Sequence, residues 1–156
     1  MATNKRFAYA AAAAIAVFWL GMLVGVSFLA TPVKFRAPSL DLPVALDVGR
    51  VTFALFSRVE WIAVALLLLA IALPRLSGWM IAAAIVAVAL LAAEFFWLLP
   101  VLDARVAAII AGEAVQPSPH HFIYALAEAA KAALLLIIGL ASLLRLASEP
   151  SAAGAR

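Results

Sequence analysis

Long apolar segments, separated by short polar or proline-rich connections, dominate the chain. They cover residues 7–30, 44–73, 79–99 and 121–146. The first contains 24 residues and no charged side chain. At a rise of about 1.5 Å per residue it is about 36 Å long, more than the roughly 30 Å of a bilayer's hydrocarbon core. The pattern predicts a single all-α domain over residues 1–156, an integral membrane bundle of four transmembrane helices.

Prolines and short connections suggest where these helices end. Thr31-Pro32 is predicted to end the first helix, and Pro100 to end the third before a loop over residues 101–119. The connection at residues 74–78 is short enough to make its two helices antiparallel neighbours. Four crossings place both termini on one side of the membrane. Lys5-Arg6, directly before the first segment, favours cytoplasmic termini in a bacterial inner membrane.

Composition supports a membrane protein and excludes several other classes. Hydrophobic residues make up 69% of the chain and charged residues only 12%. The absence of cysteine excludes disulfides and cysteine catalysis. The net charge of +3 comes from scattered basic residues, without a basic run interleaved with aromatics. The predicted partner is therefore the lipid bilayer and not nucleic acid. A cleaved signal peptide is the less favoured interpretation of the first segment, because its apolar run exceeds the about 7–15 residues of a signal core.

Ionisable residues interrupt the last apolar segment at helical spacing. His121, Tyr124, Glu128 and Lys131 follow one another at offsets of 3, 7 and 10 residues, which places them on one face of a helix. An ionisable group at bilayer depth costs about 2.5–3.5 kcal/mol, so such groups face a bundle interior or a wet cavity and have partners. This face is predicted to look into the bundle.

The second and third segments also carry charges. Arg58 and Glu60 are two positions apart, about 200° around a helix, so each needs its own partner. Tracing the helices antiparallel places these residues and Glu94 in the same leaflet as the charges of the last segment. A polar network in the outer half of the bundle is therefore predicted, made of Arg58, Glu60, Glu94, Tyr124, Glu128 and Lys131. Its mouth is predicted at His120, His121, Asp103 and Arg105.

Three interpretations of this network remain open on the sequence. It can be structural, with lysine and arginine neutralising carboxylates and fixing helix register. It can serve the passage of protons, ions or small solutes, with a carboxylate that changes its protonation state. A haem or metal site is the third interpretation. The adjacent residues His120 and His121 point about 100° apart, and HxxxH and HExxH spacings do not occur. No cofactor and no metal is therefore predicted. A GxSxG motif does not occur, and the chain is predicted not to be an enzyme.

Small residues in the first segment provide a possible helix contact. Gly21 and Gly25 form a GxxxG motif, which lets another helix approach closely. Four helices enclose little volume, so we expect a homo-oligomer or a partner within a membrane complex, with Gly21 and Gly25 at the contact.

Short motifs in the first half of the chain resemble a known family. They are Trp19-Leu20-Gly21, the run Phe28-Leu29-Ala30-Thr31-Pro32 with Phe35, and, more weakly, Asp47-Val48-Gly49 with Phe53. On these the chain resembles the uncharacterised bacterial four-span proteins related to transmembrane protein 205. The resemblance implies a compact four-helix membrane domain with no established biochemical activity. A more distant likeness is to the copper-resistance D and haem-linked membrane families. Those families have a histidine in the first span, whereas residues 7–20 contain none.

Overall fold

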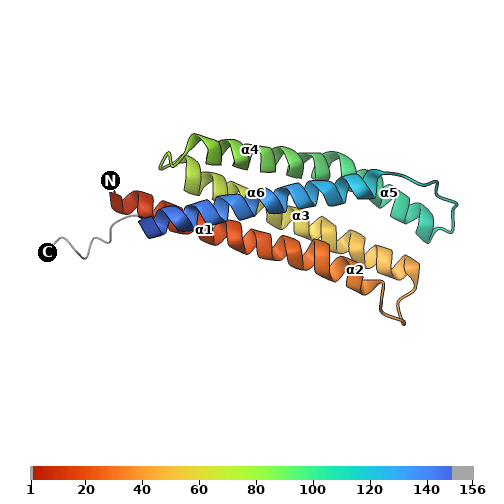
Figure 1. The fold of residues 1–156 in the computed structure, drawn as a ribbon. Coiled ribbons are helices and arrows are strands. Elements are labelled where there is room, and N and C mark those ends of the chain that lie inside the picture. Colours follow the sequence, from red (N-terminus) through yellow and green to blue (C-terminus); the bar gives the residue numbers. More distant parts are fainter. Residues whose placement is uncertain (1, 149–156) are drawn as a thin grey trace.

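Four long helices run side by side in the computed structural model, which describes residues 2–148 (Figure 1). In chain order the elements are α1 (Ala2–Leu23), the π-helical segment η1 (Val24–Ala30), α2 (Thr31–Lys34), α3 (Leu42–Ala72), α4 (Gly78–Ala93), the π-helical segment η2 (Glu94–Leu98), α5 (Leu99–Ile110) and α6 (His120–Ser148). The described residues contain no strand. The prediction of an all-α four-helix bundle is confirmed.

The elements combine into four continuous helices that are long and apolar enough to cross a membrane. Their bounds are Asn4–Lys34, Leu42–Ala72, Gly78–Ile110 and His120–Ser148. The first transmembrane helix joins α1, η1 and α2, and the third joins α4, η2 and α5. The chain is therefore an integral membrane protein.

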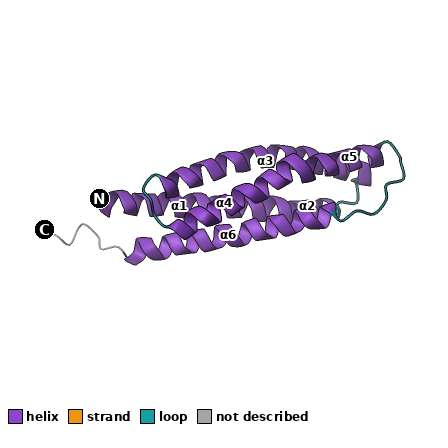
Figure 2. Cartoon of the chain, turned by 90° about the horizontal axis from the view of Figure 1, so that it is seen from above, coloured by secondary structure: helices purple, strands orange, loops and turns teal. Residues whose placement is uncertain are grey.

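Successive helices run antiparallel, which gives the bundle two different ends. The connections after α2 and after α5 lie at one end, here called the loop end (Figure 2). The start of α1, the end of α6 and the turn between α3 and α4 lie at the other, here called the terminal end (Figure 1). The most extensive contact between helices is that of α1 with α6.

Small side chains let the helices approach closely in the terminal half of the bundle. Ala12, Ala16, Ala84 and Ala87 are fully buried. Leucine and isoleucine pack around them, with Leu67, Ile71, Leu135 and Ile138 also fully buried. Many large apolar side chains point outward instead, among them Phe7, Phe18, Phe96 and Leu144. In lipid this distribution is favourable, because helix association there depends on close packing while the outer surface meets acyl chains.

The two prolines expected to end helices lie inside them. The π-helical segments η1 and η2 end two residues before Pro32 and Pro100, respectively. Thr31 N–H donates to Val26 O and Leu99 N–H to Glu94 O, each five residues back. A proline ring lacks an N–H and clashes with the carbonyl four residues earlier. The wider π-helical turn shifts the hydrogen bonding ahead of each proline, and the helix then continues.

A glycine twelve residues after Pro100 ends the third transmembrane helix. Gly112 adopts φ +78° and donates its N–H to Ile109 O, and Glu113 N–H reaches Ala108 O, both at 3.0 Å. This is a Schellman motif, in which a left-handed glycine satisfies the last helix carbonyls. The predicted loop over 101–119 is therefore wrong for residues 101–110, and the connection is limited to residues 111–119.

The glycine in close helix contact is not one of the two predicted from sequence. Around Gly21 and Gly25 a side chain would meet nothing within 4 Å, so no described segment of this chain packs there. At Gly139 of α6, a Cβ atom would lie 3.2 Å from Val17 Cγ2 and 3.6 Å from Ala16 Cβ. Gly139 therefore permits the close approach of α1 and α6.

Replacing Gly139 with a large side chain is expected to weaken the bundle. Gly139→Leu forces side-chain bulk against Val17 and Ala16, an overpacking that costs about 1–3 kcal/mol. Gly21→Leu is the matched control, because its side chain enters open space. Thermal unfolding in detergent, followed by circular dichroism, measures both variants. Equal stability of the two variants would contradict the assigned α1–α6 contact.

Candidate functional site

One lysine ammonium lies among three carboxylates inside the bundle. Lys131 Nζ is 2.8 Å from Glu60 Oε1, 2.5 Å from Glu94 Oε2 and 2.7 Å from Glu128 Oε1. Glu60 belongs to α3, Glu94 is the first residue of η2, and Glu128 lies one turn before Lys131 on α6. All four side chains are buried, with at most 1% of each exposed. Three transmembrane helices are therefore linked through one cation.

The first transmembrane helix contributes two neutral donors to the same group. Trp19 Nε1 donates to Glu60 Oε1 at 3.0 Å, and Ser27 Oγ donates to Glu128 Oε2 at 2.6 Å. Trp19 is fully buried on α1, and Ser27 lies in η1. We call Trp19, Ser27, Glu60, Glu94, Glu128 and Lys131 the Lys131 cluster. All four transmembrane helices contribute to it.

The Lys131 cluster has more acidic groups than its one cation neutralises. With every group ionised, three carboxylates and one ammonium carry a formal charge of −2. Oxygen atoms of the three carboxylates lie within 4.8 Å of one another. At an effective dielectric constant of about 20, two charges about 5 Å apart repel by roughly 3 kcal/mol. One ammonium therefore does not balance the three carboxylates while all of them are ionised.

Along the first and third transmembrane helices, the cluster lies midway between the two ends. Glu94 has 16 residues on either side within Gly78–Ile110 (94 − 78 and 110 − 94). Trp19 has 15 on either side within Asn4–Lys34 (19 − 4 and 34 − 19). The prediction stopped these two helices at their prolines, which placed Glu94 close to the end of its span. The position of the cluster relative to the two leaflets stays a prediction.

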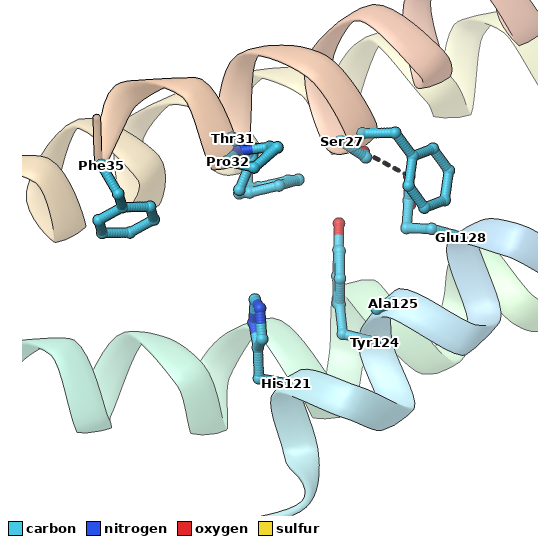
Figure 3. Close-up of a pocket in the computed structure, with 10 residues that line it drawn as sticks. Ser27, Thr31, Pro32, Phe35, His121, Tyr124, Ala125 and Glu128 are labelled. Carbon is cyan, nitrogen blue, oxygen red and sulfur yellow. Dashed lines mark hydrogen bonds between the residues drawn. The ribbon is translucent and has the colours of Figure 1, made fainter. Parts of the chain in front are cut away.

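A cleft of about 320 Å³ leads from the loop end towards the cluster (Figure 3). It lies between the first transmembrane helix and the start of α6. His121 lies at one end of the cleft, and the Ser27–Glu128 hydrogen bond lies at the other (Figure 3). Tyr124 projects between them, with 4% of the residue exposed and without a hydrogen-bond partner for its hydroxyl among the described residues. Glu128, together with Ser27, is thus the part of the cluster that lines the cleft.

Arg58 lies outside the network in which it was predicted. Its side chain is exposed on the outer face of α3, where it lines a shallow pocket with Asp103 and Pro100. Glu60 is buried on the opposite face and binds Lys131. The two-residue spacing required that only one of them face the interior, and neighbouring helices decide which one does.

The four residues predicted at the mouth of the polar network do not lie together. His121 lines the cleft. His120 bonds Ser118 and packs edge-on against Trp97, with ring centroids 6.1 Å apart. Asp103 and Arg105 are helical residues of α5 because that helix continues past Pro100, and Arg105 Nη2 donates to Gln116 O at 2.6 Å. Neither of these two lines the cleft, so His121 alone is placed as predicted.

Sequence reasoning did not identify Trp19 and Ser27 as site residues. A tryptophan in a transmembrane helix is usually found near the interface, so Trp19 at the centre of its segment indicates that the indole N–H has a buried partner. Ser27 carried no comparable signal, because a serine in an apolar helix can bond its own backbone.

The described residues contain one grouping of side chains with metal-ligand geometry. It consists of Glu60, Glu94 and Glu128, and it includes no histidine. Lys131 Nζ contacts all three carboxylates, so a metal ion would have to displace the ammonium. The absence of a cofactor remains a prediction.

The fold and the site define a class, a four-helix integral membrane protein with a buried and acid-rich ion cluster. Comparison with protein-family models, with curated proteins and with solved structures finds no match to this chain. The resemblance to proteins related to transmembrane protein 205 therefore remains a prediction.

Removing the central cation is expected to destabilise the bundle strongly at neutral pH. Lys131→Met leaves three buried carboxylates without an ammonium, and loss of one partner of a buried ion pair costs about 3–5 kcal/mol. The loss should shrink in acid, because protonated carboxyl groups need no counter-charge. Thermal unfolding in detergent at neutral and acidic pH measures both effects.

The control for this variant is Arg145→Met, which removes an exposed cation from the last turn of the same helix, α6. A change within about 0.5 kcal/mol is expected, as for most surface substitutions. An equal loss in both variants, or a loss in Lys131→Met that does not depend on pH, would contradict the assigned role of the lysine.

Proposed function

We propose that this chain is a non-enzymatic membrane protein that takes up and releases protons at the Lys131 cluster, as the binding step of proton or cation passage. One observation carries the proposal, the excess of three buried carboxylates over one buried ammonium. In an interior that disfavours net charge, a bound proton or cation offsets this excess. Exchange of that proton is the simplest chemistry of the site.

A purely structural ion cluster is less consistent with the geometry. Buried ion pairs are stable when charges balance and the remaining polar atoms are hydrogen-bonded. Glu60 Oε2 and Glu94 Oε1 are buried and have no hydrogen-bond partner among the described residues. One glutamate would be enough to neutralise Lys131 and to fix the helix register. The additional carboxylates favour a role in binding a proton or a cation.

The cleft supplies a route for protons from the loop end. Its volume of about 320 Å³ is large compared with the roughly 30 Å³ that one water occupies in the liquid. His121, Tyr124 and Glu128 line it in this order along α6. A proton reaching Glu128 then lies one ion-pair contact from Lys131.

The packing in the terminal half of the bundle supports proton uptake from the loop end. Between the cluster and the terminal end the core is largely apolar, with Ser142 as a buried polar residue and with Leu67, Ile71, Leu135 and Ile138 fully buried. Passage across the whole bilayer therefore requires a second arrangement of the helices. With the termini cytoplasmic, as Lys5 and Arg6 favour, the cleft opens to the outer side of a bacterial inner membrane.

Proton flux into liposomes tests the proposal directly. The protein is reconstituted around a trapped pH-sensitive dye, and a pH step is applied. Glu94→Gln and Glu128→Gln are expected to abolish the flux while leaving the far-ultraviolet circular dichroism unchanged. The fold should survive because Lys131 keeps two acidic partners in each variant.

Glu113→Gln is the matched control, because Glu113 is an exposed glutamate of the connection 111–119. It removes the same charge and is expected to leave the flux unchanged. Absence of flux in the unaltered protein, or flux that persists in both cluster variants, argues against proton passage. Lower thermal stability without any flux would favour a structural subunit of a membrane complex.

A haem- or metal-binding role is tested by separate measurements. Elemental analysis and a visible spectrum of detergent-purified protein are expected to show no stoichiometric metal and no haem absorbance, because Lys131 occupies the space between the three glutamates. A bound metal that is lost in Glu60→Gln would contradict this expectation. It would indicate that the cluster holds a metal cation in place of the proton.

A further inference from the structure

We infer that a second cavity, at the loop end of the bundle, binds a phosphate group through Lys34 and Arg105. We call it the end cavity. It has a volume of about 200 Å³ and is enclosed by α2, α3, α5 and α6. It adjoins the cleft, because His121 and Tyr124 line both. The inference rests on residues other than those of the Lys131 cluster.

The lining of the end cavity combines basic groups with an apolar wall. Its basic residues are Lys34, Arg50, Arg105 and His121. No aspartate or glutamate is among its lining residues. The wall includes Leu99, Leu102, Val106 and Ile109. An amphiphilic anion matches this lining, with its charge at the basic groups and its apolar part against the wall.

The Lys34 ammonium is held in position without an anion. A Cβ atom at Gly49 would lie 2.1 Å from Lys34 Nζ, so the absence of a side chain at position 49 makes room for the ammonium. The ring of Phe35 lies 5.0 Å from Nζ, a cation–π distance. No carboxylate among the described residues forms an ion pair with Lys34. This side chain is therefore a preplaced cation available to an anionic ligand.

The two arginines at the end cavity differ in how many of their guanidinium N–H groups already have an acceptor. Arg50 binds Asp47 through both Nε and Nη2, at 2.9 and 2.5 Å. Arg105 donates Nη2 to the carbonyl of Gln116, and its remaining guanidinium N–H groups have no acceptor among the described residues. Lys34 and Arg105 thus supply the donors of the site.

A phosphate ester is the ligand chemistry that suits this position. Phosphate oxygens accept charge-assisted hydrogen bonds from lysine and arginine together. The 31-residue first helix is about 46 Å long, so its end at Lys34 extends beyond a hydrocarbon core of about 30 Å. The end cavity therefore lies at the depth of lipid head groups. The phosphate can come from a membrane lipid or from a soluble compound.

Native mass spectrometry of the full chain in detergent tests the inference. The protein is titrated with phosphatidylglycerol, with diacylglycerol of the same acyl chains and with inorganic phosphate. Phosphatidylglycerol is expected to bind, and Lys34→Gln to weaken it at least about ten-fold, as expected for loss of a charge-assisted hydrogen bond. Lys5→Gln, the same substitution at an exposed lysine of the terminal end, should bind like the unaltered protein.

A second variant separates binding from folding. Gly49→Ala introduces a Cβ where the ammonium lies, and the flexible lysine side chain must move while the backbone stays. It is expected to weaken binding as Lys34→Gln does, with unchanged thermal unfolding. Gly25→Ala, at a glycine with open space around it, is its control.

The outcomes identify the source of the phosphate or overturn the inference. Binding of phosphatidylglycerol alone, sensitive to both variants, indicates a membrane lipid. Inorganic phosphate that binds with the same sensitivity and displaces the lipid indicates a soluble phosphate compound. Equal binding of diacylglycerol, or binding unchanged in Lys34→Gln and Gly49→Ala, overturns the inference. None of these results depends on proton flux, so this inference and the proposed function fail separately.

Discussion

The structure depends on one ammonium shared by carboxylates from three helices. In an apolar medium neither Lys131 nor Glu60, Glu94 and Glu128 has water to solvate its charge, so each group depends on the others. The contacts fix the rotation and height of α3, η2 and α6 at once. Trp19 and Ser27 bring the first transmembrane helix to the same level through neutral donors. The same contacts concentrate more acidic groups than one lysine balances.

Each π-helical segment contributes one residue to the Lys131 cluster. Ser27 lies in η1 and Glu94 opens η2, and each segment ends two residues before a proline. A wider turn changes the direction of the side chains that follow and tolerates the missing proline N–H. π-Helical turns are frequent at functional sites for this reason. The two helices extend beyond their prolines to Lys34 and Ile110, and this added length places the cluster near mid-bundle.

The interior of the bundle is more polar at the loop end than at the terminal end. The cleft and the end cavity both open at the loop end, and their linings share Thr31, Phe35, Phe53, His121 and Tyr124. The ring of Phe53 packs edge-on against Tyr124 at 5.3 Å between centroids, so one aromatic pair lies between the two spaces. Towards the terminal end, the buried side chains are mainly leucine, isoleucine and alanine, with Ser142 among them. A ligand in the end cavity and a proton in the cleft would therefore meet the same side chains.

The sequence by itself determined the membrane class, the four helices and the polar face of α6, since segment length and a 3.6-residue period are local properties. It also showed that Arg58 and Glu60 must face different ways. Only the tertiary structure decided that Glu60 faces inward, that Trp19 and Ser27 are partners, and that Gly139 and not Gly21 is a helix contact. The helix ends beyond Pro32 and Pro100 were decided there as well. The rotation of a helix about its axis is set by the surfaces packed against it, and in a chain this apolar most rotations bury similar side chains. The position of the few charges relative to their neighbours therefore depends on contacts between segments distant in the sequence.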